Sequence, residues 1–447
     1  MLNNKIKLIQ KVVANLSAYI IAFFLFATTG GAWMVDTSLS LSNPQCNWWL
    51  LAITIVASLF LFILPYNNKK YFSNIVIKKI FLFIICSVTY MYNFKGDFEW
   101  YFSYFFLFII WSMILLYCSN DCRIVWKAFV NIVLIYAIVS LFFYFVGTFF
   151  QLIPNSGKTS LNWGPWTENI KTYYNIYYES QFFRINEFRI IPRNCGIFPE
   201  GPMYNFVLCT AIACELFITK KTHWWKIIIL LFTAFTTFST TTYLFLIIAV
   251  LLYLANIVFK QDVKTIYKKI FIWISLVGFM CVLAVVVHKF TTISGSGSMS
   301  VRNAHVIACL KAWKESPILG VGFQNIERVL EFSDNSSGMS MGLPFFVATG
   351  GIVMTALIFV PYLLNLFFPS KNKCYSECAF ETLFIVLYIP TAVTTYPIFS
   401  FFISYIIILN SEFQNEHYDS LKNKIENFVV NKEIPSVTHY KFIKKKK

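Results

Sequence analysis

Long apolar runs alternate along this chain with short polar gaps. A run of about 17–25 apolar residues is long enough to cross a bilayer as one helix. The pattern predicts twelve membrane-spanning helices, at 12–31, 48–66, 80–94, 99–117, 128–150, 203–219, 227–238, 241–259, 270–288, 344–367, 377–391 and 396–410. The run at 227–238 is short and the last two runs share a turn, so ten spans fit the same pattern. We therefore expect an all-α, polytopic membrane protein with a single transmembrane domain over 1–447.

The composition supports this class. Hydrophobic residues make up 57% of the chain and charged residues only 13%, whereas soluble domains are nearer half apolar and one quarter charged. A net charge of +16 would suit a nucleic-acid-binding protein, but the basic residues lie in short gaps and form no basic domain. We therefore predict no nucleic-acid partner.

The basic residues predict the orientation, because loops rich in Lys and Arg stay on the cytoplasmic side. Every second gap is basic: 5–11, 69–79, 123–127, 220–226, 260–269, 371–373 and 444–447. Both termini, including a basic tail at 411–447, are predicted to be cytoplasmic. Two large loops, at 151–202 and 289–343, are predicted to lie on the opposite side, and we call them the first and second outer loops.

Arginine is concentrated in these outer loops. The chain has 31 Lys but only six Arg, and five arginines lie there: Arg184, Arg189, Arg193, Arg302 and Arg328. A guanidinium binds phosphate or carboxylate through two parallel hydrogen bonds. We interpret the enrichment as a site for an anionic ligand. The alternative is pairing with nearby acids, such as Glu179, Glu187, Glu200 and Glu327.

The outer loops are predicted to be folded. In the second, Val306, Leu310 and Trp313 recur at helical spacing, and a tight turn follows at Gly320-Val-Gly322. His305 lies in that helix as a structural residue or a catalytic candidate. The many aromatic residues of the first loop suit either a membrane-interface belt or stacking on sugar rings. Neither loop has a metal-ligand spacing, so we predict no metal and no cofactor.

Two outer-loop motifs resemble those of a known family. The stretch Arg193-Asn-Cys-Gly-Ile-Phe-Pro-Glu-Gly-Pro202 resembles the Arg-x-x-Gly-x-Phe-x-Glu-Pro/Gly motif of O-antigen and capsule polymerases (Wzy type). The stretch from Arg302 through Trp313 to Gly322 is similar to the second outer-loop motif of these polymerases and of the related O-antigen ligases. Residues 236–242 lie where the family carries a Ser-Arg pair, but this Arg is missing. The ligase His-Asn pair is also missing from Ser336-Ser-Gly-Met-Ser340, which favours polymerase over ligase and leaves the general base open.

The resemblance implies a metal-independent glycosyltransferase in the bacterial cytoplasmic membrane. It would polymerise undecaprenyl-diphosphate-linked oligosaccharide repeat units into a surface polysaccharide, beside membrane lipid, chain-length regulator and flippase partners. Arg193 and Arg302 would neutralise the leaving diphosphate, and Glu200 would act as the base or simply pair with Arg193. The predicted substrate-binding residues are Arg184, Arg189, His305, Trp313, Gly320, Gly322 and Arg328.

Other functions remain open at this point: an O-antigen ligase-like transferase, a lipid-linked sugar flippase, or a peptidoglycan polymerase of the shape, elongation and division type. A flippase would place polar groups inside its spans, where this chain has almost no charge. The motifs of the peptidoglycan polymerase are missing.

Cysteine labelling tests the predicted orientation. Cysteines introduced near Ser156 and Ser296 should react with an impermeant thiol reagent in intact cells, because both positions lie in predicted outer loops. Cysteines near Asn67 and Asn415 should react only after the cells are lysed. Labelling near Asn67 in intact cells would reverse the orientation.

Overall fold

The computed structural model describes residues 2–34, 52–56, 74–93, 98–118, 123–163, 166–186, 189–219, 221–260, 293–333, 339–367, 375–394 and 396–409, with a few single positions between 273 and 284. Most of the predicted spans 48–66 and 270–288 lies outside these residues, as does the predicted tail at 411–447.

Most of the described chain is helical. The helices are α1 (Leu2–Ala27), α3 (Asn74–Asn93), α4 (Phe98–Cys118), α5 (Ile124–Phe142), α6 (Gly201–Phe217), α7 (Trp224–Thr236), α8 (Thr240–Lys260), α10 (Ile293–Glu315), α11 (Ile326–Leu330), α12 (Gly342–Phe367) and α13 (Tyr375–Tyr388). A short 3-10 helix, η1 (Ala32–Met34), follows α1, and a π-helix, η3 (Phe143–Phe149), continues α5. A further apolar helix runs over Pro397–Leu409.

The apolar helices identify a membrane protein. Among the described residues, four helical stretches are long and apolar enough to cross a bilayer: Leu8–Ala27, Ile124–Phe149, Thr240–Val258 and Gly342–Phe367. Shorter apolar helices cover Phe105–Tyr117, Gly201–Phe217, Trp224–Thr236 and Pro397–Leu409. Each of these eight overlaps a predicted span, while the total of twelve stays a prediction.

The first outer loop forms β-structure, which the all-α prediction missed. β1 (Gly157–Trp163), β2 (Trp166–Tyr173) and β3 (Tyr177–Glu179) make an antiparallel sheet, and β4 (Phe182–Asn186) pairs with β5 (Arg189–Pro192) as a hairpin. Aromatic and β-branched residues favour strands, and they are frequent here. Tyr174 and Asn175 adopt positive φ angles of 52° and 54° in the turn between β2 and β3.

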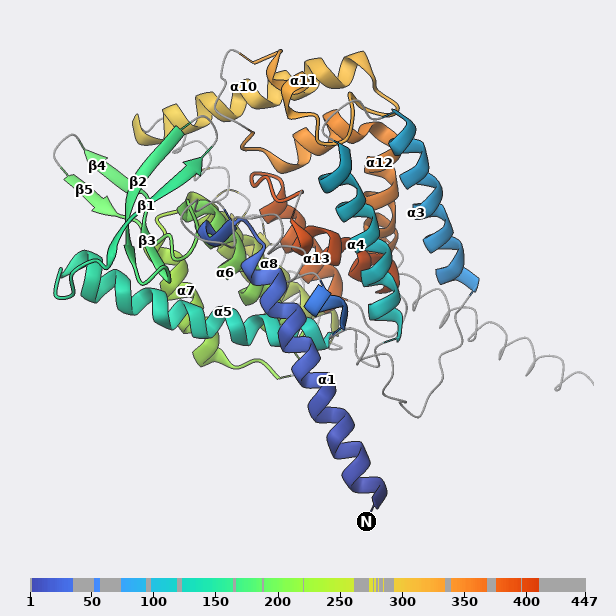
Figure 1. The fold of residues 1–447 in the computed structure, drawn as a ribbon, viewed down its shortest axis with the longest axis horizontal. Coiled ribbons are helices and arrows are strands. Elements are labelled where there is room, and N and C mark those ends of the chain that lie inside the picture. The colour runs from blue at the N-terminus through green and yellow to red at the C-terminus, as the bar shows by residue number, and fades with distance from the viewer. Residues whose placement is uncertain are drawn as a thin grey trace, which may run out of the picture.

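Helix α6 lies at the centre of the helical bundle. It packs against α5, α7, α8 and α13, and almost all of its residues are buried. Its N-terminal end therefore holds the preceding residues of the first outer loop in a fixed position. Figure 1 shows the strands gathered at the left of the molecule and α10 running across the top, from the strands towards α12.

The second outer loop is fixed to α12 through glycines. Gly351 interrupts α12 with a φ of 64°, and the Val353 N–H donates to the carbonyl of Ile318 at 3.1 Å. The Val321 N–H donates to the Ala348 carbonyl at 3.0 Å. Gly320, with a φ of +75°, comes so close that an added Cβ would lie 2.3 Å from the carbonyl oxygen of Thr349. Only glycine fits this backbone contact.

Replacing Gly320 should destabilise the protein. In Gly320→Ala, the positive φ alone costs about 1–3 kcal/mol, and the overlap with Thr349 adds to that cost. The thermal unfolding temperature in detergent should fall by several degrees. Gly157→Ala is the matched control, because a Cβ there meets nothing within 4 Å. Equal unfolding temperatures for the two variants would contradict the close backbone contact.

Candidate functional site

The Arg193 side chain is anchored at the junction of three segments. Its Nε donates to the Thr237 carbonyl at 2.8 Å and Nη2 to the Phe238 carbonyl at 3.4 Å, both in the turn between α7 and α8. Its Nη1 donates to Oε1 of Gln181 at 3.2 Å. The Thr-rich turn that lacks the family's arginine thus holds Arg193 through backbone carbonyls.

Gly201 makes room for this guanidinium. An added Cβ would lie 2.9 Å from Arg193 Nε and Nη2 and from the Thr237 carbonyl oxygen. The Gly201 N–H, at the start of α6, donates to the same Gln181 oxygen at 3.2 Å. The Glu-Gly pair of the motif therefore has a physical reason: the glycine allows the arginine to pack against the helix end.

Glu200 occupies the N-cap position of α6 but does not cap the helix with its side chain. Its extended backbone (φ −141°, ψ 149°) instead leaves the carboxyl group free of the helix end. Burial raises the pKa of Glu200, while the positive charges of Arg193 and Arg302 oppose that rise. The same burial lowers the pKa of both guanidiniums, and Glu200 opposes it.

Arg302 joins this group from the second outer loop. It lies in α10, whereas Arg193 and Glu200 belong to the first loop. Its guanidinium is half-buried, and among the described residues its five N–H donors have no hydrogen-bond acceptor or ion-pair partner. The partly buried Glu200 carboxyl therefore lies within electrostatic range of both Arg193 and Arg302.

His305 lies one turn after Arg302 in α10 and is only 1% exposed. Its Nδ1 accepts from the Ser340 N–H at 3.3 Å and lies 2.9 Å from the Ser340 hydroxyl. The neutral ring then carries its proton on Nε2, which has no partner among the described residues. Burial also lowers the pKa of His305. This arrangement suits donation of a hydrogen bond better than removal of a proton.

Other predicted site residues in the second loop have structural contacts. The Trp313 Nε1 donates to the Pro317 carbonyl at 3.2 Å, and Gly320 lies against α12. Gly322 adopts a φ of +114° in the turn. Arg328 is exposed and forms ion pairs with Glu315 and Glu331. For this arginine, the alternative interpretation, pairing with nearby acids, is therefore the one that the structure supports.

Arg184 and Arg189 lie in the β4–β5 hairpin. Arg184 pairs in register with Ile190 in β5, and Arg189 pairs with Asn186 in β4. The hairpin leads directly into Arg193. Both arginines therefore belong to the same segment of the chain as Arg193.

The sequence did not reveal several residues that shape the site. Gln181 stands among aromatic residues without any motif, and the Thr237 and Phe238 carbonyls belong to the backbone. Buried acids in the helices were also missed: Glu215 and Glu381 are both 0% exposed. Glu215 accepts from His223 and Glu381 from Asn365.

Comparisons with known proteins do not identify a function, so the functional argument rests on the geometry of the site. No protein family, curated protein or solved structure matches this chain. A fold alone does not specify an activity, so the residues around Glu200 carry the functional argument.

Proposed function

We propose that this protein is a membrane glycosyltransferase that polymerises polyprenyl-diphosphate-linked oligosaccharide repeat units on the outer face of the bacterial cytoplasmic membrane. One observation carries the proposal: Arg193 and Arg302, from different loops, both act electrostatically on the partly buried carboxyl of Glu200. Two guanidiniums suit a diphosphate, and a carboxylate with a raised pKa is a stronger proton acceptor than an ordinary carboxylate.

The reaction assigns each group a role. A hydroxyl oxygen of the acceptor sugar attacks the anomeric carbon of the donor glycan, and the bond from that carbon to the diphosphate oxygen breaks with inversion. The Glu200 carboxylate takes the hydroxyl proton. The unused donors of Arg302 and Arg193 stabilise the negative charge on the departing lipid diphosphate.

Long-range contacts support the proposed grouping of the loops into two opposite sides of the membrane. The Trp33 indole donates to the Asn175 carbonyl at 2.6 Å, and both residues lie on the predicted outer side. Arg123 forms an ion pair with Glu377, and both lie on the predicted inner side. The lipid tail would stay in the bilayer, since exposing it costs about 0.8 kcal/mol per CH₂, so the diphosphate must react at the outer interface.

The buried acids do not favour transport. A proton or ion relay would need charged groups midway through a span. Glu215 lies two residues before the end of α6, and Glu377 and Glu381 lie in the first two turns of α13. The contacts of these acids with His223, Arg123 and Asn365 suit a structural role at helix ends.

Removing Arg302 should abolish polymer formation while the protein still folds. Arg302→Ala should lower the turnover rate by about 10²–10³-fold, since loss of one oriented donor typically costs roughly 3–4 kcal/mol. Cells should then carry single repeat units. Arg302→Lys should restore activity poorly, because a point charge cannot form two-point contacts.

The control for this experiment is Arg328→Ala, which removes an exposed arginine that already pairs with Glu315 and Glu331. It should retain polymer of normal length. Full-length polymer in Arg302→Ala cells, with normal protein levels, would exclude the diphosphate role of Arg302.

The pH dependence should report on Glu200. A base works only when ionised, and the pKa of Glu200 is raised, so the rate should rise with pH through a midpoint above the ordinary carboxyl value of about 4.3. Arg302→Ala removes a charge that lowers this pKa and should move the midpoint to higher pH, whereas Arg302→Lys should not.

The check on this assignment is Glu200→Gln, which should lose the pH-dependent limb together with most activity. A purified enzyme that keeps the wild-type profile after this substitution would show that another group is the base.

A further inference from the structure

A separate pocket lies beside the strands of the first outer loop. It has a volume of about 320 Å³, which is at the small end of the range for ligand sites. Its walls come from the end of η3 (Gly147 and Thr148), from residues 151–155, from β2, from Glu179 in β3, and from the β4–β5 hairpin. None of the three residues assigned to glycosyl transfer lines it.

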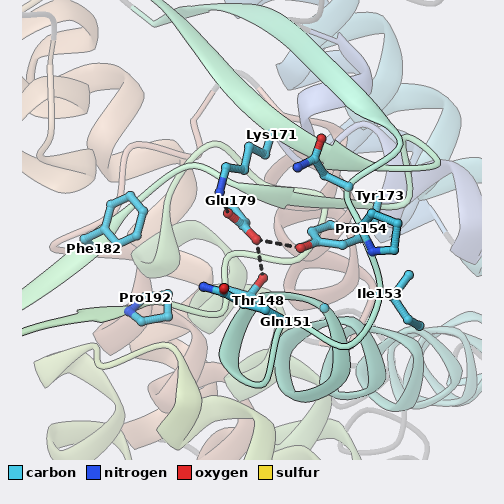
Figure 2. Close-up of a pocket in the computed structure, with 11 residues that line it drawn as sticks. Thr148, Gln151, Ile153, Pro154, Lys171, Tyr173, Glu179, Phe182 and Pro192 are labelled. Atoms are coloured by element: carbon cyan, nitrogen blue, oxygen red, sulfur yellow. Dashed lines mark hydrogen bonds and ion pairs between the residues drawn. The ribbon is translucent and has the colours of Figure 1, made fainter.

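A buried carboxylate lies in the wall of this pocket. The Glu179 side chain is 8% exposed, and its Oε1 accepts from the Thr148 hydroxyl and the Tyr173 hydroxyl, each at 2.8 Å. Figure 2 shows these two contacts among the lining residues. Burial and the hydrogen bond to Glu179 raise the pKa of Tyr173 to about 12, so its hydroxyl stays protonated as a donor.

The second carboxylate oxygen of Glu179 has fewer close contacts than the first. Its Oε2 lies 3.6 Å from the ammonium of Lys171, which is longer than a hydrogen bond. Lys171 itself is half exposed. A carboxylate accepts about four hydrogen bonds, so Oε2 can take donors from a ligand. The Phe182 ring, 58% exposed, adds an apolar face at the rim.

The pocket and the Arg193 site share one hairpin. Phe182 and Pro192, which line the pocket, are register partners in β4 and β5. The adjoining residues are Gln181 and Arg193, joined by a hydrogen bond from the Arg193 N–H to the Gln181 carbonyl at 3.0 Å. Neighbouring residues of a strand lie about 3.3 Å apart along the backbone, so adjacent residues of one hairpin connect the pocket to the Arg193 site.

We propose that the Glu179 pocket is a saccharide subsite that binds one neutral sugar residue of the repeat unit beside the bond-forming site. Sugar hydroxyls donate to Glu179 Oε2, Lys171 donates to a sugar oxygen, and the apolar face of the ring stacks on Phe182. An anionic sugar is disfavoured by the Glu179 carboxylate. This inference rests on the proposed function, since it takes the ligand to be part of the same glycan.

The test is binding of the repeat-unit oligosaccharide, released from its lipid by mild acid, to purified protein in detergent. Saturation-transfer NMR or calorimetry gives the dissociation constant. Glu179→Gln keeps an oxygen for Thr148 and Tyr173 but replaces the second acceptor by a donor, and binding should weaken about tenfold or more. Glu327→Gln, the same change at an exposed position of α11, should leave binding unchanged.

Phe182→Ala serves as a second variant, because loss of a half-exposed ring leaves the fold intact even if Glu179→Gln misfolds. It should also weaken binding. Wild-type affinity in both variants, or no binding to the wild-type protein, would overturn the subsite.

The experiments can distinguish failure of the saccharide subsite from failure of the proposed transfer mechanism. Because the released oligosaccharide has no diphosphate, Arg302→Ala should bind it normally while losing polymerisation. Polymerisation by Arg302→Ala, with binding still lost in Glu179→Gln, would reject the transfer mechanism and keep the subsite.

Discussion

The Arg193 guanidinium connects three parts of the chain on which the proposed site depends. Its hydrogen bonds reach the carbonyls of the α7–α8 turn and the amide of Gln181, and it packs against Gly201 at the start of α6. A partly buried guanidinium is stable only when its donors are satisfied. The backbone carbonyls meet that need without neutralising the charge, so Arg193 remains available to attract an anion.

The positive charge of Arg193 also affects the pKa of Glu200. The centre of the bundle, around α6, removes water from the carboxyl group and raises its pKa, while two guanidiniums limit the rise. Opposing effects of burial and neighbouring charge are the means by which a protein site adjusts the pKa of an acid or base. The same pair of charges that would bind a diphosphate thus also adjusts the proposed base, and the two roles are physically linked.

The β4–β5 hairpin connects the Glu179 pocket to the Arg193 site. One register pair, Phe182 and Pro192, faces the Glu179 pocket, and the adjoining pair, Gln181 and Arg193, shapes the charged site. A polymerase must hold a sugar chain and a lipid diphosphate at once. A rigid hairpin that carries both contacts would fix their separation, which favours reaction because the reacting groups are already oriented.

The sequence by itself determined the membrane class and most helix positions, because a bilayer requires each span to satisfy its own backbone within one apolar run. It also placed Arg193, Glu200 and Gly201 together, since they are near neighbours in one motif. Tertiary structure decided that Arg302 joins them, that Arg328 pairs with acids instead, and that the first loop forms strands. These outcomes depend on contacts between distant segments and on backbone carbonyls, which have no residue signature. The Glu179 pocket was not predicted for the same reason, because its walls come from five stretches of the chain between residues 147 and 192.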